Sequence, residues 1–229
     1  MKRSIPVRWH DYRRSVLKTA WLLALVAFIL PNTLSAGERS SILVMGDSLS
    51  AAYNIEREAG WVTLLAERLG DDVEVINASI SGETTSGGAQ RFPKLLRQHS
   101  PTMVLLELGG NDGLRGLSPQ QMRANLAQMI EQSQAAGAEV LLLGIDIPPN
   151  YGQAYRDAFK GFFTELADTY DVPLVPFLLE DIALNDSLMQ DDDIHPTTEA
   201  QPIILDNVWP KLAPMLKANG TELAQRDQE

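Results

Sequence analysis

The chain contains no cysteine among its 229 residues. Its fold therefore uses no disulfide, and a thiol nucleophile or a thiolate metal site is excluded. Histidine is also scarce, with three residues, so histidine-dependent chemistry has few candidates. Basic residues are outnumbered, because 19 lysines and arginines stand against 30 aspartates and glutamates. The net charge of −11 disfavours nucleic acid and anionic membrane surfaces as partners.

A long apolar run is missing too. The longest, Ala20–Leu30, has 11 residues, whereas a membrane-spanning helix needs about 20. Six basic residues precede this run, and small residues ending at Ala36 follow it. The order predicts a secretory signal peptide over residues 1–36, with an uncleaved membrane anchor as the alternative. Arg13-Arg14 resembles a twin-arginine export signal, so a Sec or a twin-arginine route is open. We expect a periplasmic or secreted protein without stable membrane insertion after cleavage.

The remaining chain is predicted to form one domain, residues 37–217, followed by a polar tail, 218–229. Cleavage would remove six of 19 basic and one of 30 acidic residues, lowering the net charge to −16. Five short apolar runs predict strands: 42–45, 73–76, 103–108, 140–143 and 174–177. Helical segments alternate with them: 61–69, 86–97, 120–136, 155–170 and 198–217. Apolar strands alternating with helices indicate a three-layer αβα sandwich around a parallel sheet.

Ser48 is the candidate nucleophile. It follows the first predicted strand in the sequence Gly46-Asp47-Ser48-Leu49, and open α/β sheets do chemistry at strand ends. A nucleophilic serine needs a base, an orienting carboxylate and oxyanion donors. His10 would leave with the signal peptide, and His99 enters the third strand, at the opposite edge of the sheet. His195 is therefore the only plausible base.

An acidic loop, Asp191–Asp193, precedes His195. A carboxylate three residues before a histidine can fold back in a tight turn and bond one ring nitrogen, leaving the other free to take a proton. Asp192 has that spacing. The loop has two other interpretations, a solvated acidic surface or a cation site formed by the three aspartates.

Two further loops follow predicted strands, Ser79–Thr84 and Gly109–Gly113. Glycine lets backbone N–H groups approach a ligand closely, and Asn111 adds a side-chain amide. Both features suit an oxyanion hole. Ordinary turn chemistry is the alternative for each loop.

Together, four blocks resemble the SGNH (GDSL-type) hydrolase family: Gly46-Asp47-Ser48-Leu49, Gly82, Gly110-Asn111-Asp112 and Asp192-x-x-His195. The resemblance spans about Ser41–Lys217 and is closest to the bacterial periplasmic thioesterase I, lysophospholipase and arylesterase group. It implies a flavodoxin-like, five-stranded parallel sheet. It also implies a small acyl ester or thioester as substrate, without a metal or organic cofactor. We expect a monomer.

The resemblance also assigns roles to residues. Ser48 would be the nucleophile, His195 the base and Asp192 its orienter. The oxyanion hole would consist of the Ser48 and Gly82 N–H groups and the Asn111 side chain. The expected function is a serine esterase that cleaves aryl esters, acyl-CoA and lysophospholipids through an acyl-enzyme on Ser48. The alternatives are a carbohydrate O-acetyl esterase of the same superfamily and a non-catalytic periplasmic lipid-binding protein.

The expected substrate-binding residues lie in loops after the third, fourth and fifth strands: Leu114, Ile145, Asp146, Ile147, Pro148 and Phe177. Two positions depart from the family pattern. Asp193 stands where related sequences often have glycine, and its carboxylate could compete for His195. Asp146 places an acid in the loop that helps to cover the acyl site in the family, where it could disfavour a long apolar chain.

Overall fold

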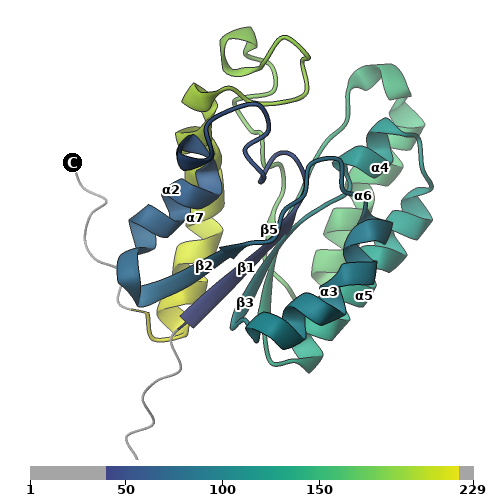
Figure 1. The fold of residues 1–229 in the computed structure, drawn as a ribbon. Helices are drawn as coiled ribbons and strands as arrows, with labels where there is room; N and C mark the ends of the chain where they lie inside the picture. Colours follow the sequence, from purple (N-terminus) through teal and green to yellow (C-terminus); the bar gives the residue numbers. More distant parts are fainter. Residues whose placement is uncertain (1–39, 222–229) are drawn as a thin grey trace, which may run out of the picture. The chain divides into compact units, whose positions relative to one another are not determined.

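The structure, a computed structural model, describes residues 40–221 (Figure 1). Five parallel strands form one sheet in the order β2-β1-β3-β4-β5, which is the flavodoxin-like order. The strands are β1 Ser40–Gly46, β2 Val73–Asn77, β3 Met103–Glu107, β4 Glu139–Leu143 and β5 Leu174–Val175. The predicted parallel sheet is confirmed. The expected signal peptide lies outside the described residues.

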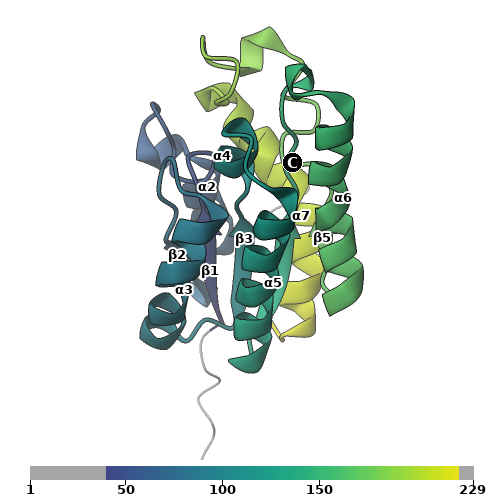
Figure 2. The same ribbon diagram turned by 90° about the vertical axis from the view of Figure 1, so that its right-hand side faces the viewer.

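Helices cover both faces of this sheet. They are α2 Trp61–Leu69, α3 Thr85–His99, α4 Gly110–Leu114, α5 Pro119–Ala135, α6 Gln153–Tyr170 and α7 Gln201–Ala218. Single 3-10 turns occur at 57–59, 70–72, 149–151, 186–188 and 198–200. Helices α2 and α7 pack on one face, whereas α3, α5 and α6 pack on the other (Figures 1 and 2). The predicted three-layer sandwich is therefore confirmed. In the described part of the chain, no helix combines the length and apolarity needed to cross a membrane.

Two elements differ from the sequence prediction. The segment of α4 was expected to be a loop, because its glycines, Asn111 and Asp112 are typical turn residues. Strand β5 ends at Val175, two residues before the predicted end at Phe177. The next residue, Pro176, has no N–H with which to continue the ladder.

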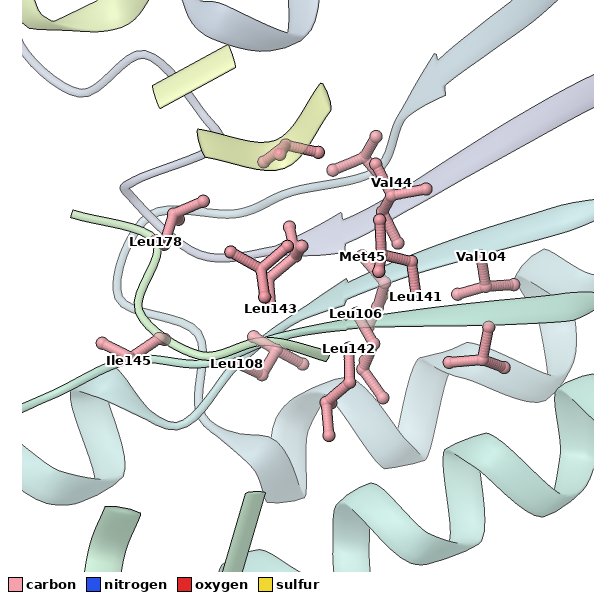
Figure 3. Close-up of a cluster of buried hydrophobic side chains, with 14 of the residues drawn as sticks. Val44, Met45, Val104, Leu106, Leu108, Leu141, Leu142, Leu143, Ile145 and Leu178 are labelled. Atoms are coloured by element: carbon pink, nitrogen blue, oxygen red, sulfur yellow. The ribbon is translucent and has the colours of Figure 1, made fainter. Parts of the chain in front are cut away.

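Apolar side chains on both faces of the sheet form the core. Figure 3 shows Val44 and Met45 of β1 beside Leu106 of β3 and Leu142 of β4, all within 1% of full burial. Adjacent residues of one strand point to opposite faces, so both faces must be covered by helices. Burying a side chain of this size contributes about 1.5–3 kcal/mol. This rigid sheet holds the loops that follow its strands.

The chain reverses its direction of travel across the sheet at β1. From β1 it crosses to β2 on one side and then returns to β3 on the other. Parallel sheets bind ligands at such a switch point, beyond the carboxyl ends of the two strands. Gly46, the last residue of β1, lies opposite Glu107, the last residue of β3. The loops that carry Ser48 and Asn111 therefore start side by side.

Gly144 provides a test of packing where the chain leaves β4. A Cβ atom there would lie 2.3 Å from the Pro176 carbonyl oxygen. We expect Gly144→Ala to lower the free energy of unfolding by about 1–3 kcal/mol, because backbone must move. Gly161 is the control, since a Cβ atom there meets nothing within 4 Å and lies inside α6. Gly161→Ala should raise stability by roughly 0.5–1 kcal/mol. Urea denaturation measures both, and equal effects would contradict the packing argument.

Candidate active site

Ser48, His195 and Asp192 form one chain of hydrogen bonds. His195 Nε2 lies 2.8 Å from Ser48 Oγ, and His195 Nδ1 lies 2.7 Å from Asp192 Oδ2. Ser48 is buried in the turn after β1, and the His195 side chain is 15% exposed. The imidazole can thus accept the serine proton at one nitrogen while the carboxylate holds the other.

The Asp192 carboxylate also shapes the loop that carries the histidine. Its Oδ1 accepts hydrogen bonds from the backbone N–H groups of Ile194, at 3.0 Å, and His195, at 2.9 Å. Burial acts to raise the pKa of Asp192, but these hydrogen bonds and the one from the His195 ring hold it below its ordinary value. The lowered pKa favours the ionised carboxylate of Asp192. This carboxylate closes the turn and also orients the His195 ring.

Asp193 takes a different place. Its backbone lies in the left-handed region, with φ +55°, where glycine fits without steric cost. Its N–H donates to the Gln190 carbonyl oxygen at 3.0 Å, and the residue lines the cavity described below. The histidine ring is bonded to Asp192 and not to Asp193. Within residues 40–221, no group of three or more acidic or histidine side chains is arranged to hold a metal ion.

Two residues that the sequence did not single out secure His195. The ring of Tyr53 lies against the imidazole, with 4.2 Å between ring centroids. Gln190 Nε2 donates to the carbonyl oxygens of Tyr53, at 3.0 Å, and Pro196, at 2.9 Å. Gln190 thereby ties the histidine loop to the segment that follows Ser48. No local pattern marks either residue, because both act between distant segments.

The predicted oxyanion loops are tied to the same edge of the sheet. The N–H of Ile80 donates to the Gly46 carbonyl oxygen at 3.1 Å, which aligns the Gly82 loop with the end of β1. Gly82 has φ +79°, a conformation that favours glycine. The Arg115 guanidinium donates to the Gly82 carbonyl oxygen at 3.1 Å, joining this loop to the segment after Asn111.

A buried pair of acids lies next to Ser48. Glu107 is 0% exposed, and its Oε2 accepts the Asp47 N–H at 3.1 Å and the Ser50 hydroxyl at 2.8 Å. A Cβ atom on Gly46 would lie 2.6 Å from this oxygen, so the position requires glycine. Burial raises the pKa of Asp47 to about 6. Burial and the neighbouring Asp47 charge raise the pKa of Glu107 well above its ordinary value. Both shifts favour the neutral form of a carboxyl group, so this pair holds a proton more tightly than two exposed acids would.

A cavity of about 400 Å³ opens beside Ser48 and Asn111. All six expected substrate-binding residues line it: Leu114, Ile145, Asp146, Ile147, Pro148 and Phe177. Further apolar side chains come from the segment between β5 and α7: Leu179, Ala183, Leu184, Met189 and Ile194. The cavity is therefore mostly apolar, as expected for a site that takes an acyl chain.

Asp146 is the polar exception in this wall, and the structure gives it partners that the sequence did not reveal. Its side chain is 12% exposed and binds the Arg156 guanidinium at 2.5 Å and the Lys160 ammonium at 3.3 Å. The Ile147 N–H donates to the same carboxylate at 2.8 Å. Burial acts to raise the pKa of Asp146, but hydrogen bonds led by that of Arg156 hold it below its ordinary value. The acid is thus an ion-paired anchor of the loop.

Comparison with known proteins agrees with this geometry. Residues 44–202 match the GDSL-like lipase/acylhydrolase family. The chain belongs to this family. It is 46% identical to Esterase TesA of Pseudomonas aeruginosa, over 87% of this chain and 100% of that one. It is also 46% identical to thioesterase 1/protease 1/lysophospholipase L1 of Escherichia coli K12, over 82% of this chain and 91% of that one.

A solved structure supports the same assignment. The psychrotrophic esterase EstA from Pseudoalteromonas sp., inhibited by monoethylphosphonate, aligns with a TM-score of 0.74 and 44% identity. The alignment covers 78% of this chain and 99% of that one. Family membership and these relatives make the chain an ester-hydrolysing enzyme, with the flavodoxin-like fold of its family.

The raised pKa of Glu107 has a testable effect on stability. The folded protein holds a proton on Glu107 that the unfolded chain releases above a pKa of about 4.5, so stability falls as the pH rises. Glu107→Gln keeps an accepting oxygen and removes this effect. We expect its Tm to exceed that of the wild type at pH 8, with the gap shrinking toward pH 5. Each kcal/mol corresponds to roughly 2–4 °C. A Tm difference that widens toward pH 5 would contradict the raised pKa of Glu107.

Proposed function

We propose that the protein is a serine esterase that cleaves acyl esters and thioesters through an acyl-enzyme on Ser48. The observation that carries the proposal is the hydrogen-bonded chain Ser48–His195–Asp192 at the mouth of an apolar cavity. A lipid-binding protein would need the cavity but has no use for a base aimed at a serine. The apolar lining favours acyl chains over the acetyl groups of sugar esters.

The first half-reaction transfers the acyl group to the enzyme. His195 Nε2 takes the Ser48 proton while Oγ attacks the carbonyl carbon, whose oxygen becomes an oxyanion. The backbone N–H groups of Ser48 and Gly82 and the Asn111 amide would donate to that oxyanion. One such donor contributes about 2.7–4 kcal/mol in other hydrolases. The imidazolium, stabilised by Asp192, then gives its proton to the leaving alcohol or thiol.

The second half-reaction releases the acid. Water enters, His195 takes one of its protons, and the hydroxide attacks the acyl carbon. The tetrahedral intermediate collapses, the bond to Ser48 Oγ breaks, and the imidazolium returns the proton to that oxygen. Every proton in the cycle passes through His195 Nε2, so no resident cofactor is required.

The substrates we propose are aryl esters, acyl-CoA thioesters and lysophospholipids. Two of the relatives described above, an esterase and a thioesterase/lysophospholipase, support this range. The cavity wall after β4 lies two interstrand spacings from β1, about 10 Å. An extended chain advances about 1.2 Å per bond, given about 3.6 Å per three-bond residue. An acyl chain of about eight bonds thus spans from the nucleophile to the charged Asp146 wall.

We also propose that the enzyme acts as a monomer outside the cytoplasm after loss of residues 1–36. The basic, apolar and small-residue order of that segment supports export. A family match that begins at residue 44 supports a catalytic domain that starts after this segment.

Ser48→Ala tests the central assignment. We expect the variant to fold with an unchanged circular dichroism spectrum, to lose labelling by a fluorophosphonate probe, and to lose at least about 10³-fold in kcat. Ser50, whose hydroxyl donates to Glu107, is the matched serine, because Ser50→Ala should still be labelled. Labelling of the Ser48→Ala protein at another serine would refute the proposal.

The ion pair in the cavity wall gives a second test. Replacing both Asp146 and Arg156 with leucine removes this ion pair without leaving either of the two charges unpaired. Lys160 loses a partner, but its half-exposed ammonium stays in contact with water. We expect the preferred p-nitrophenyl ester to become longer, with little change on acetyl esters. Each added methylene that becomes buried is worth about 0.8 kcal/mol, roughly fourfold in kcat/KM.

The control removes an ion pair away from the cavity. Arg123 and Glu165 join the exposed surfaces of α5 and α6 at 3.1 Å. The Arg123→Leu/Glu165→Leu variant should keep the wild-type chain-length profile. An unchanged profile in the Asp146/Arg156 variant would remove this wall from the account of specificity.

A further inference from the structure

The Asn111 amide needs a fixed orientation. A carboxamide presents an acceptor oxygen and a donor nitrogen of nearly equal size, so its shape alone does not decide which one faces a substrate. Only the nitrogen can stabilise an oxyanion. Asn111 Nδ2 donates to Asp47 Oδ2 at 3.0 Å, and a carboxylate oxygen can accept a hydrogen bond but not donate one. This contact excludes the flipped amide.

Asp47 is itself held rigidly. Its Oδ1 accepts the N–H of Leu49 at 3.1 Å, and its own N–H donates to Glu107. A Cβ atom on Gly110 would lie 3.3 Å from Asp47 Oδ2, so the glycine lets the two loops approach. The carboxylate is 2% exposed. Asp47 therefore joins the turn that carries Ser48 to the helix start that carries Asn111.

We propose that Asp47 is a positioning residue of the esterase, whose carboxylate aims the second N–H of Asn111 at the oxyanion. The inference rests on the function proposed above. Asp47 touches neither substrate nor reacting atoms in this role, and its effect on catalysis passes through Asn111.

The charged groups that face Asp47 support this role. Glu107 of β3 contacts its carboxylate from below, and His195 of the loop before α7 acts on it electrostatically. Two ionised carboxylates beside an oxyanion would oppose the reaction. The raised pKa of Glu107 favours its neutral form, which adds no second charge beside Asp47. The Asp47 oxygens accept hydrogen bonds from Asn111 and Leu49. Its single negative charge also favours the imidazolium that forms on His195.

A double-mutant cycle tests the route through Asn111. We expect Asn111→Ala to lower kcat by about 10²–10³ and Asp47→Asn to lower it by up to about 10², with KM changing little. An asparagine at 47 has one acceptor oxygen for two donors. If Asp47 acts through Asn111, the double variant will be no slower than Asn111→Ala alone. Effects that multiply would overturn the inference, because independent sites add in free energy.

Asp112 supplies the matched control. It is the neighbouring buried carboxylate, but it accepts from the backbone and hydroxyl of Thr85, at 2.8 and 2.7 Å. Any loss of kcat in Asp112→Asn should multiply with that of Asn111→Ala. An equally non-additive result for Asp112 would show that the loop responds only to general destabilisation, and would overturn the role of Asp47.

A second measurement avoids replacing Asp47. In a His195→Gln background, which removes the titrating imidazole, the side-chain amide resonances of Asn111 should shift as Asp47 titrates. Their midpoint should lie above pH 6, because the His195 charge that lowers the pKa of Asp47 is gone. Resonances that stay fixed between pH 7.5 and 5 would overturn the contact. Fluorophosphonate labelling of the wild type tests the proposed function of Ser48 separately from the role of Asp47. If Ser48 is labelled and the cycle is additive, only the role of Asp47 fails.

Discussion

The parallel pairing of β1 with β3 is the constraint on which the site depends. Gly46 lies opposite Glu107, and the carboxyl group of Glu107 occupies the space above the glycine. From this point the segments that follow β1 and β3 leave the sheet side by side, one leading to Ser48 and the other to Asn111. Because both segments start from a ladder of backbone hydrogen bonds, the relative placement of Ser48 and Asn111 is set by the sheet. Electrostatics oppose the arrangement, since a buried charged acid is costly, and this cost raises the pKa of Glu107 in favour of its neutral form.

The site therefore combines a half built on strand ends and a half built on a loop. Ser48 and Asn111 follow buried strands, whereas His195 and Asp192 lie in a loop whose turn is closed by the Asp192 carboxylate. The cavity lining shows the same division. Ile145 and Ile147 follow β4, but Leu184 and Ile194 lie in the long segment between β5 and α7, and the Leu184 side chain is almost fully exposed. The sheet fixes the positions of Ser48 and Asn111, whereas the segment between β5 and α7 supplies the other wall of the cavity.

Much of this arrangement could be predicted from the chain, for identifiable reasons. Apolar runs located the strands, and the order of Ser48, Asn111 and His195 along the chain located the site, because parallel strands end at one edge. Helix α4 was not predicted, since its glycine and asparagine residues are typical of turns, and only contacts with its neighbours select the helix. The partners of Asp146 could not be predicted from the sequence either. Arg156 lies on the next helix, and no local sequence pattern indicates that the two side chains form an ion pair. Glu107 did carry a signal: it is an acid inside an otherwise apolar strand.

The separation of Ser48 and His195 by 147 positions has a consequence for folding. Ser48 lies in the turn after the first strand of the sheet, whereas His195 belongs to the segment before the last helix. Contacts between such distant segments form late, because the entropy of closing a long loop must first be overcome. A chain that ends before this loop contains Ser48 but lacks His195. The capacity to cleave esters is thus a reporter of complete folding, and a partly folded chain inside the cell would leave acyl esters intact.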